Sequence, residues 1–292
     1  MAWLINPAQL DKFRKSQRNL VILDASWYLP EHNRDAKAEF LAQHLPGARF
    51  LDLNLFHDAA IDLPNMLSRD AQQMSERIGA LGIANDTKII FYDDSPLHTS
   101  CRALWMFKLF GHPGNQLYLL DGGFAAWKQY NSKTESGESR VSPRPYSVNF
   151  QLQYLRARAA MKANLQHPAE QVIDMRHSVR FAGGVEHRPG VRSGHIPGSF
   201  CFPYMTMFES TGCFKPLEKI TKQLLGIGVD VDQPIVTMCG SGMTAPILNV
   251  ILDLLDRSQH ALYDGSWAEW GARHLYPGEA SLDERPVVTS LE

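Results

Sequence analysis

Cys239 lies in the segment whose residue types are best suited to chemistry. It opens the sequence Cys-Gly-Ser-Gly-Met-Thr-Ala, residues 239–245, which joins an apolar run to a helical pattern. Gly240 and Gly242 permit backbone angles that a side chain would forbid, so the loop can turn its amide hydrogens toward one point. Amide hydrogens and the positive end of the following helix favour a thiolate, the nucleophilic form of cysteine. The pattern predicts a nucleophilic cysteine, with a buried structural cysteine as the alternative.

The other residues of this loop narrow the chemistry further. Ala245 stands six residues after the cysteine, where cysteine-dependent phosphatases need an arginine to grip phosphate with paired hydrogen bonds. Phosphate-ester chemistry is therefore disfavoured, because no fork-shaped cation closes the loop. We expect the substrate to contact the loop residues Gly240, Gly242, Met243 and Thr244.

Short apolar runs followed by longer amphipathic segments surround this loop. The runs at residues 89–92 and 235–238 are typical of strands, and residues 101–110 and 244–255 are typical of helices. Such alternation predicts an α/β fold, a parallel sheet covered by helices on both faces. Cys239 would then lie at the carboxyl end of a strand, where ligands bind in such sheets.

The chain contains an internal repeat. Four landmarks recur in the same order: Leu23-Asp24 and Ile173-Asp174, His44-Leu45-Pro46-Gly47 and His195-Ile196-Pro197-Gly198, Ile89–Asp93 and Ile235–Cys239, and Asp121-Gly122 and Asp264-Gly265. The repeat indicates a duplicated domain of roughly 140 residues. Asp24 and Asp174 are expected to fix the turns after their strands. Asp93 stands where the second copy has Cys239, and no glycine follows it before residue 100. Because only one copy keeps the glycine loop, the loop is not a requirement of the fold.

Two domains and a linker follow from the repeat. We predict a first domain over residues 1–130, a linker over 131–147 and a second, catalytic domain over 148–292. The linker is polar and contains Gly137, Pro143 and Pro145, with no hydrophobic period.

The overall composition excludes several classes of protein. The 292 residues are 44% hydrophobic and 21% charged, with a net charge of -2, which predicts neither a nucleic-acid nor a membrane partner. No apolar run approaches the ~20 residues of a membrane span, and we expect a cytoplasmic protein. Four cysteines are too few for a disulfide framework. The sequence contains no Cys-x-x-Cys pair, so a structural zinc site is not expected. Cys201 is expected in the core and Cys213 as a surface thiol.

These motifs resemble the rhodanese-type sulfurtransferases, and within them the 3-mercaptopyruvate branch. The resemblance covers nearly the whole chain, from Leu23-Asp24-Ala25-Ser26-Trp27 to Tyr263-Asp264-Gly265-Ser266-Trp267. That branch carries Cys-Gly-Ser-Gly-Val-Thr-Ala, which this chain matches with Met243 in place of valine. The thiosulfate branch carries Cys-Arg-Lys-Gly-Val-Thr-Ala, whose two cations suit a dianion. The resemblance implies two tandem rhodanese-like domains, with the first one catalytically silent because of Asp93.

Further site residues are implied by the same resemblance. It maps the family's two substrate-binding arginines to Arg180 and Arg188. The segment between them is one residue shorter than in the relatives, so Arg180 is the firmer assignment of the two. It also maps an Asp-His-Ser arrangement to Asp35, His44 and Ser241. His195 occupies the position of His44 in the second copy, which leaves a structural role as the alternative for His44.

The activity implied is sulfur transfer through a persulfide on Cys239. The donor would be 3-mercaptopyruvate, which leaves as pyruvate, and the acceptor would be thioredoxin, a small thiol or cyanide. No metal or organic cofactor is expected. The alternatives are a thiosulfate:cyanide sulfurtransferase and a non-catalytic sulfur-carrier module.

Overall fold

The computed structural model describes residues 3–130 and 133–290. Residues 1–2, 131–132 and 291–292 lie outside the described residues. They include the start of the predicted first domain, the start of the predicted linker and the end of the predicted second domain. The chain divides into two compact units. The first takes in the chain up to His57 together with Ser68–Gln151 and Phe208–Lys215. The second takes in Asp58–Leu67, Leu152–Met207 and the chain from Pro216 onward. Each unit thus contains a short segment from the other half of the sequence, and the predicted domain limits stay a prediction.

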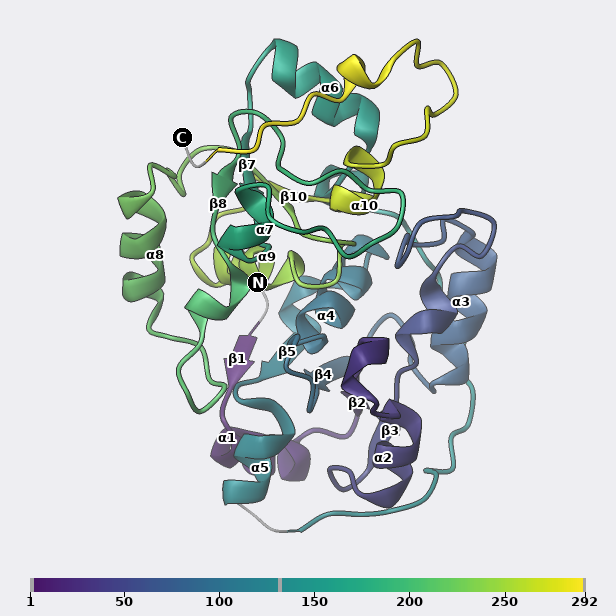
Figure 1. The fold of residues 1–292 in the computed structure, drawn as a ribbon. Helices are drawn as coiled ribbons and strands as arrows, with labels where there is room; N and C mark the ends of the chain where they lie inside the picture. The colour runs from purple at the N-terminus through teal and green to yellow at the C-terminus, as the bar shows by residue number, and fades with distance from the viewer. Residues whose placement is uncertain (1–2, 131–132, 291–292) are drawn as a thin grey trace. The chain divides into compact units, whose positions relative to one another are not determined.

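The first unit is a five-stranded parallel sheet in the order β1-β5-β4-β2-β3 (Figure 1). Its strands are β1 (Trp3–Ile5), β2 (Leu20–Asp24), β3 (Ala48–Phe50), β4 (Lys88–Tyr92) and β5 (Leu117–Leu120). Its α-helices are α1 (Pro7–Ser16), α2 (Ala36–Ala42), α3 (Ala71–Ala80), α4 (Ser100–Leu109) and α5 (Gly123–Tyr130). Short 3-10 helices span Pro30–His32, Leu53–Phe56 and Gly114–Gln116.

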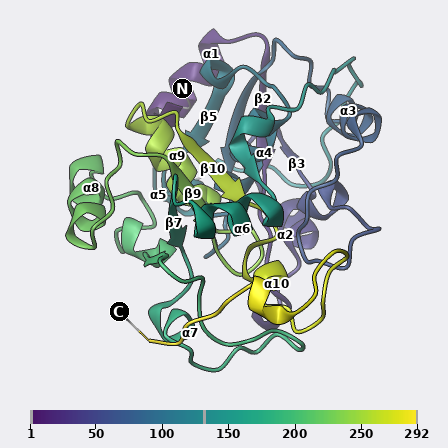
Figure 2. The ribbon, with the colours of Figure 1, turned by 90° about the horizontal axis from the view of Figure 1, so that it is seen from above.

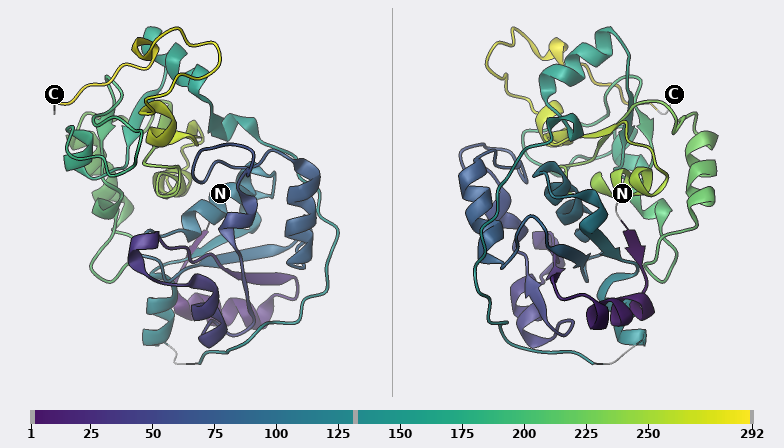
Figure 3. Two further views of the ribbon diagram at one scale, coloured as in Figure 1. Left: turned by 45° about the vertical axis from the view of Figure 1, so that its right-hand side comes forward. Right: turned by 180° about the vertical axis from the view of Figure 1, so that it is seen from behind.

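Alternate residues of these strands face opposite layers of helices. Ile22, Ile90 and Tyr92 pack in one buried cluster with residues of α1, α2 and α5, and α1 lies against α5 (Figure 3). Phe91 points the other way, where its ring lies 5.2 Å from that of Phe107 on α4. A sheet covered on both faces needs apolar residues at consecutive positions, which explains the unbroken run Ile89–Tyr92.

The second unit repeats this arrangement in the order β6-β10-β9-β7-β8. Its strands are β6 (Leu155–Arg156), β7 (Gln171–Asp174), β8 (Phe200–Cys201), β9 (Ile235–Met238) and β10 (His260–Tyr263). Its α-helices are α6 (Arg158–Gln166), α7 (Ser178–Phe181), α8 (Leu217–Gly226), α9 (Pro246–Leu254) and α10 (Ser266–Trp270). Short 3-10 helices span Leu152–Tyr154, Tyr204–Met207 and Leu282–Glu284.

Helices cover both faces of the second sheet as well. Val236 and Met238 pack with Met161 of α6 and Trp267 of α10. Thr237 points to the opposite face, where its hydroxyl donates to Asn249 of α9 at 2.5 Å, and α9 runs beside β9 and β10 (Figure 2). The predicted fold class is confirmed in both units.

The local predictions hold, with shifts of one or two residues at the helix ends. Asp24 and Asp174 accept from the amides two residues on, at 2.9 and 3.0 Å, and so fix the turns after β2 and β7 as predicted. The helix after Cys239 begins at Pro246, two residues later than predicted, because proline suits a first turn, where no amide partner is needed. No helix within residues 3–130 and 133–290 combines the length and the apolar character that crossing a bilayer requires.

Candidate functional site

Cys239 directly follows β9, the central strand of the second sheet. Its side chain is buried, with the residue only 3% exposed. Its own N–H donates to the hydroxyl of Ser266, the first residue of α10, at 3.2 Å. The structure therefore places the cysteine where a parallel sheet of this kind binds ligands.

The backbone of the loop is anchored so that its amides face away from α10. The carbonyls of Cys239 and Gly240 accept from the N–H groups of Trp267 and Ala268, at 3.0 and 2.9 Å. In a trans peptide the N–H points opposite to the carbonyl, so the N–H groups of Gly240 and Ser241 point away from α10. Within the described part of the chain, no acceptor takes the N–H groups of residues 240, 241, 243, 244 or 245. These donors remain for an anion bound at the loop.

Gly242 is needed for the course of this loop. Its φ is +75°, a conformation that residues with a Cβ adopt at a cost. The sequence prediction that both glycines permit unusual backbone angles is confirmed at Gly242 and is wrong at Gly240, whose φ is not positive.

The corresponding loop of the first unit is filled by its own side chain. Asp93 follows β4, and its two carboxylate oxygens accept from the N–H groups of Ser95 and Ser100, at 3.0 and 2.7 Å. Burial raises the pKa of Asp93 to about 6. The amides of the first loop thus donate to a carboxylate of the protein itself and are not available to a substrate. This supports the prediction that the first domain is catalytically silent.

Both predicted arginines lie against the Cys239 loop. Arg180 comes from α7, and Arg188 comes from the segment that follows it. A Cβ added to Gly240 would lie 3.6 Å from Nη1 of Arg180 and 3.9 Å from Nη1 of Arg188. Arg188 also donates through Nη1 to the Gly240 carbonyl at 2.7 Å. The structure brings the two guanidinium groups together beside the cysteine loop, within ordinary contact distance of a Cβ at position 240.

Glu186 is a member of this cluster that we did not predict. Its side chain is 4% exposed, and its two oxygens accept from Nη2 of Arg180 at 2.7 and 2.9 Å. It also accepts from the backbone N–H of Arg188 at 3.2 Å. Burial lowers the pKa of Arg188, and Glu186 opposes that shift. A carboxylate between two predicted arginines was a signal that the sequence offered.

Asn65 is a second unpredicted member, and it comes from the segment Asp58–Leu67. Its Nδ2 donates to the hydroxyl of Ser241 at 2.7 Å. The N–H of Leu67 donates to Asp264, the residue after β10, at 2.9 Å. With its oxygen accepting from Asn65, Ser241 keeps its own proton for another acceptor. No local sequence pattern predicts this contact, because Asn65 and Ser241 are 176 residues apart in the chain.

Asp35 and His44 both lie in the first unit, where each makes structural contacts. Asp35 caps α2 by accepting from the N–H of Ala38 at 3.0 Å. His44 is 1% exposed, stacks on Phe40 and places Nδ1 2.6 Å from the Phe40 carbonyl. His195 repeats this arrangement with Phe181, at 2.8 Å. A contact present in both copies favours a structural role for His44, and a catalytic role for His44 and Asp35 stays a prediction.

The other three cysteines differ from Cys239 in their surroundings. Cys101 is buried in α4, and burial raises the pKa of its thiol. Cys201 was expected in the core, which is wrong: it is half-buried because β8 is the edge strand of its sheet. Burial raises its pKa to about 11 and also raises that of Cys213, which is half-buried rather than exposed. None of these three thiols is favoured as a thiolate near neutral pH.

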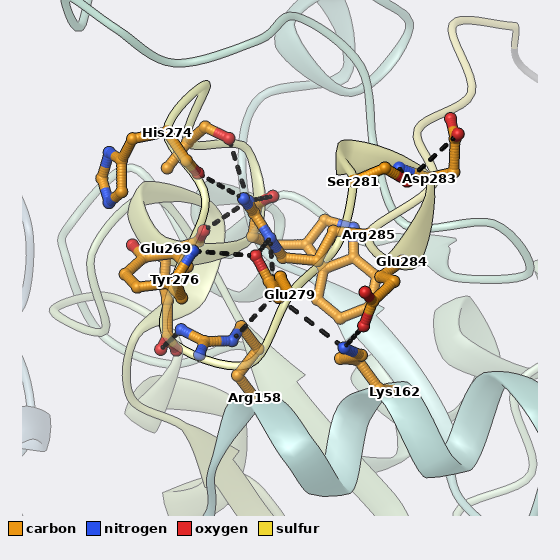
Figure 4. Close-up of polar contacts among 12 residues, drawn as sticks. Arg158, Lys162, Glu269, His274, Tyr276, Glu279, Ser281, Asp283, Glu284 and Arg285 are labelled. Carbon is orange, nitrogen blue, oxygen red and sulfur yellow. Dashed lines mark hydrogen bonds and ion pairs between the residues drawn. The ribbon is translucent and has the colours of Figure 1, made fainter.

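An ion-pair network holds the C-terminal end of α10, the helix whose first amides anchor the cysteine loop. Arg285 is fully buried and donates to the carbonyls of Glu269, Trp270 and Ala272 at the end of that helix, at 3.0, 2.5 and 2.9 Å. Its Nε also donates to both oxygens of Glu279 at 3.1 Å. Figure 4 shows Arg158 extending from α6 toward Glu279, 3.2 Å away. The helix that anchors the loop is thus itself held at its C-terminus.

Comparison with known proteins agrees with this geometry. A model of the rhodanese-like domain matches residues 6–130 and 157–273. The 3-mercaptopyruvate sulfurtransferase of Mus musculus is 37% identical over 269 residues, covering 91% of this chain and 90% of that protein. The thiosulfate sulfurtransferase of Gallus gallus is 34% identical over 253 residues, covering 86% of each. The crystal structure of SseA from Escherichia coli, described among the 3-mercaptopyruvate sulfotransferases, matches with a TM-score of 0.82 at 29% identity, covering 91% of this chain and 99% of that one. The chain therefore belongs to the rhodanese family, and it carries two rhodanese-like domains in tandem.

Proposed function

We propose that the protein is a 3-mercaptopyruvate sulfurtransferase that carries sulfur as a persulfide on Cys239. The observation that carries this proposal is the Cys239 loop, which lies beside Arg180 and Arg188 and in which the N–H groups of residues 240, 241, 243, 244 and 245 lack acceptors among the described residues. Gly240 and Ser241 add no charge to that loop. Relatives in Mus musculus and Escherichia coli bear the name of this activity.

In the first half of the proposed cycle, the donor is oriented by its carboxylate. Arg180 and Arg188 offer paired donors that match the oxygens of a planar α-keto acid. The Cys239 thiolate attacks the sulfur of 3-mercaptopyruvate and forms the S–S bond while the C–S bond breaks. The electron pair of that bond leaves on pyruvate enolate, which takes a proton at carbon to become pyruvate.

Ser241 is placed to assist the leaving enolate. Because Asn65 donates to its oxygen, the hydroxyl proton of Ser241 is available to the developing negative charge. In the proposed cycle, the N–H groups of the loop donate hydrogen bonds to the thiolate sulfur of Cys239 and later to the outer sulfur of the persulfide. Gly242, Met243 and Thr244 line the same loop and complete the proposed substrate site.

In the second half of the cycle, an acceptor removes the outer sulfur. A thiolate of thioredoxin or of a small thiol, or a cyanide ion, attacks that sulfur and the Cys239 thiolate leaves. No metal or organic cofactor enters either half. We also propose a cytoplasmic location; cell fractionation tests it, since one relative in Arabidopsis thaliana is named as mitochondrial.

Pyruvate release with 3-mercaptopyruvate and several acceptors tests the proposal. We expect turnover by the wild type and none by Cys239→Ser, which should stay folded because the change is small. After donor treatment, mass spectrometry should detect the mass of one added sulfur atom on the wild type and none on Cys239→Ser. Turnover by Cys239→Ser would rule the mechanism out.

The second candidate is a thiosulfate:cyanide sulfurtransferase, favoured by the similarity to the Gallus gallus enzyme. Comparing kcat/KM for the two donors with cyanide as the common acceptor decides between them. A sulfur-carrier module would form the persulfide once and would not turn over with a small thiol.

A further inference from the structure

Five charged side chains cluster beside the Cys239 loop in the second unit. Arg176 is held by Asp174 in a bidentate pair, with distances of 2.6 to 3.0 Å. Arg180 is held by Glu186 at 2.7 and 2.9 Å. Arg176 reaches Glu186 as well, at 3.8 Å, so the two pairs are neighbours.

Arg188 is the unbalanced member of the cluster. It donates to the Gly240 carbonyl and has no carboxylate partner at ion-pair distance anywhere in residues 3–130 and 133–290. Among these five side chains, three guanidinium groups thus face two carboxylates, which leaves a single surplus positive charge before the Cys239 thiolate is counted. The carboxylates are nearly inaccessible, with 0% exposure for the side chain of Asp174 and 4% for that of Glu186, so water screens the count poorly.

We infer that Glu186 determines donor selectivity by cancelling the charge of Arg180, so that the site accepts a donor with one negative charge and disfavours one with two. The inference rests on the proposed function. The Cys239 thiolate is present with either donor, and a 3-mercaptopyruvate ion adds one negative charge beside Arg188. Thiosulfate carries two negative charges, and one of them would stay uncompensated in a half-buried site.

The contacts of Glu186 also allow a purely structural role, in which it only orients Arg180. Charge and orientation are separable by substitution. Glu186→Gln keeps the length of the side chain and one oxygen acceptor for Arg180 but removes the charge. Glu186→Asp keeps the charge and shortens the reach.

A matched control lies at the opposite end of the same sheet. Glu170 precedes β7 and holds Arg156 in a bidentate pair at 2.7 to 3.1 Å. Its register places it at the amino ends of the strands, since Gln171 is opposite Ile235 whereas Asp174 is opposite Met238. Glu170→Gln therefore changes the net charge of the protein by the same amount without touching the site.

The experiment measures kcat/KM for thiosulfate and for 3-mercaptopyruvate in the four proteins, with cyanide as the acceptor. In Glu186→Gln we expect the ratio of thiosulfate to 3-mercaptopyruvate to rise about tenfold or more, because one unit charge at a few ångströms acts strongly in such a site. The value for thiosulfate itself should rise, which damage to the fold cannot produce. Glu186→Asp and Glu170→Gln should keep the wild-type ratio within about twofold, as surface charge changes usually do.

An equal loss for both donors in Glu186→Gln would overturn the inference in favour of a structural role. If that variant does not fold, inhibition of the wild type decides: pyruvate should compete better than the dianion oxalate, and the reverse order overturns the inference. A wild type without 3-mercaptopyruvate turnover would instead contradict the proposed function, so the two failures are distinguishable.

Discussion

At the scale of single residues, Ser266 shows how the second unit was adapted to hold Cys239. Its φ is 50°, a left-handed conformation that is rare for a residue with a Cβ, and Gly123 occupies the corresponding position of the first unit with φ 55°. The Ser266 hydroxyl accepts from the N–H of Cys239 and donates to the carbonyl of Tyr263. The backbone strain at Ser266 is thus retained because its side chain holds the amide of Cys239.

We therefore predict that Ser266→Gly lowers activity and leaves stability nearly unchanged. Relief of the left-handed strain should offset the lost hydrogen bonds, so the free energy of unfolding should change by less than about 1 kcal/mol. Turnover should fall by about fivefold or more, since the Cys239 amide loses its acceptor. Urea unfolding and pyruvate release measure the two effects. Asp256→Gly, at φ 61° beyond α9, is the control: it should gain stability and keep full turnover.

Asp93 gives a prediction about pH at the same scale. Burial raises its pKa from 3.8 to about 6, so the folded state binds a proton more tightly than the unfolded chain does. Its contribution to stability is complete below pH 3.8 and is lost as pH rises through 6. Relative to the wild type, Asp93→Asn should gain about 2 kcal/mol between pH 4 and pH 7. Urea unfolding at the two pH values checks this, and a pH-independent difference would contradict it.

At the scale of elements, α10 links the C-terminal part of the chain to the cysteine loop. Its first amides anchor Cys239 and Gly240, and its last carbonyls are held by Arg285. A five-residue helix has little stability of its own. The position of the loop therefore depends on contacts beyond residue 280, far from the cysteine in sequence.

Arg285→Lys tests this dependence. Arg285 also donates to the carbonyl of His274 at 2.7 Å, which makes four carbonyl partners. A lysine cannot serve these four carbonyls and Glu279 together, and buried acceptors left without donors are costly. We expect a loss of about 3 kcal/mol in the free energy of unfolding, measured with urea. Arg257→Gln breaks the exposed pair with Asp232 in the same unit and should cost less than about 1 kcal/mol. Equal losses in the two variants would contradict the proposed role of Arg285.

At the scale of the whole molecule, the repeat predicted the two sheets, and the loop predicted the place of Cys239. Local periodicity and turn chemistry carry that information. Glu186, Ser266 and Asn65 were missed for different reasons. Glu186 was missed although its place between the two predicted arginines was a signal in the sequence, and the role of Ser266 depends on a backbone angle. Asn65 lies in a segment whose place in the second unit depends on tertiary packing, which no local pattern encodes.

The placement of Asp58–Leu67 leads to a prediction about the halves of the chain. A fragment of residues 148–292 lacks Asn65 and the amide of Leu67, so Ser241 and Asp264 lose partners found in the whole chain. We expect the fragment alone to lose at least about 90% of turnover, since these contacts border the cysteine loop. Asn65→Ala in the full chain separates the contribution of the side chain, and it should lower turnover while the protein stays folded. Co-expression of residues 1–147 with the fragment should restore activity, because the missing segment returns with them. Full turnover by the fragment alone would show that Asp58–Leu67 is dispensable, and that the second sheet and its loop suffice for the chemistry.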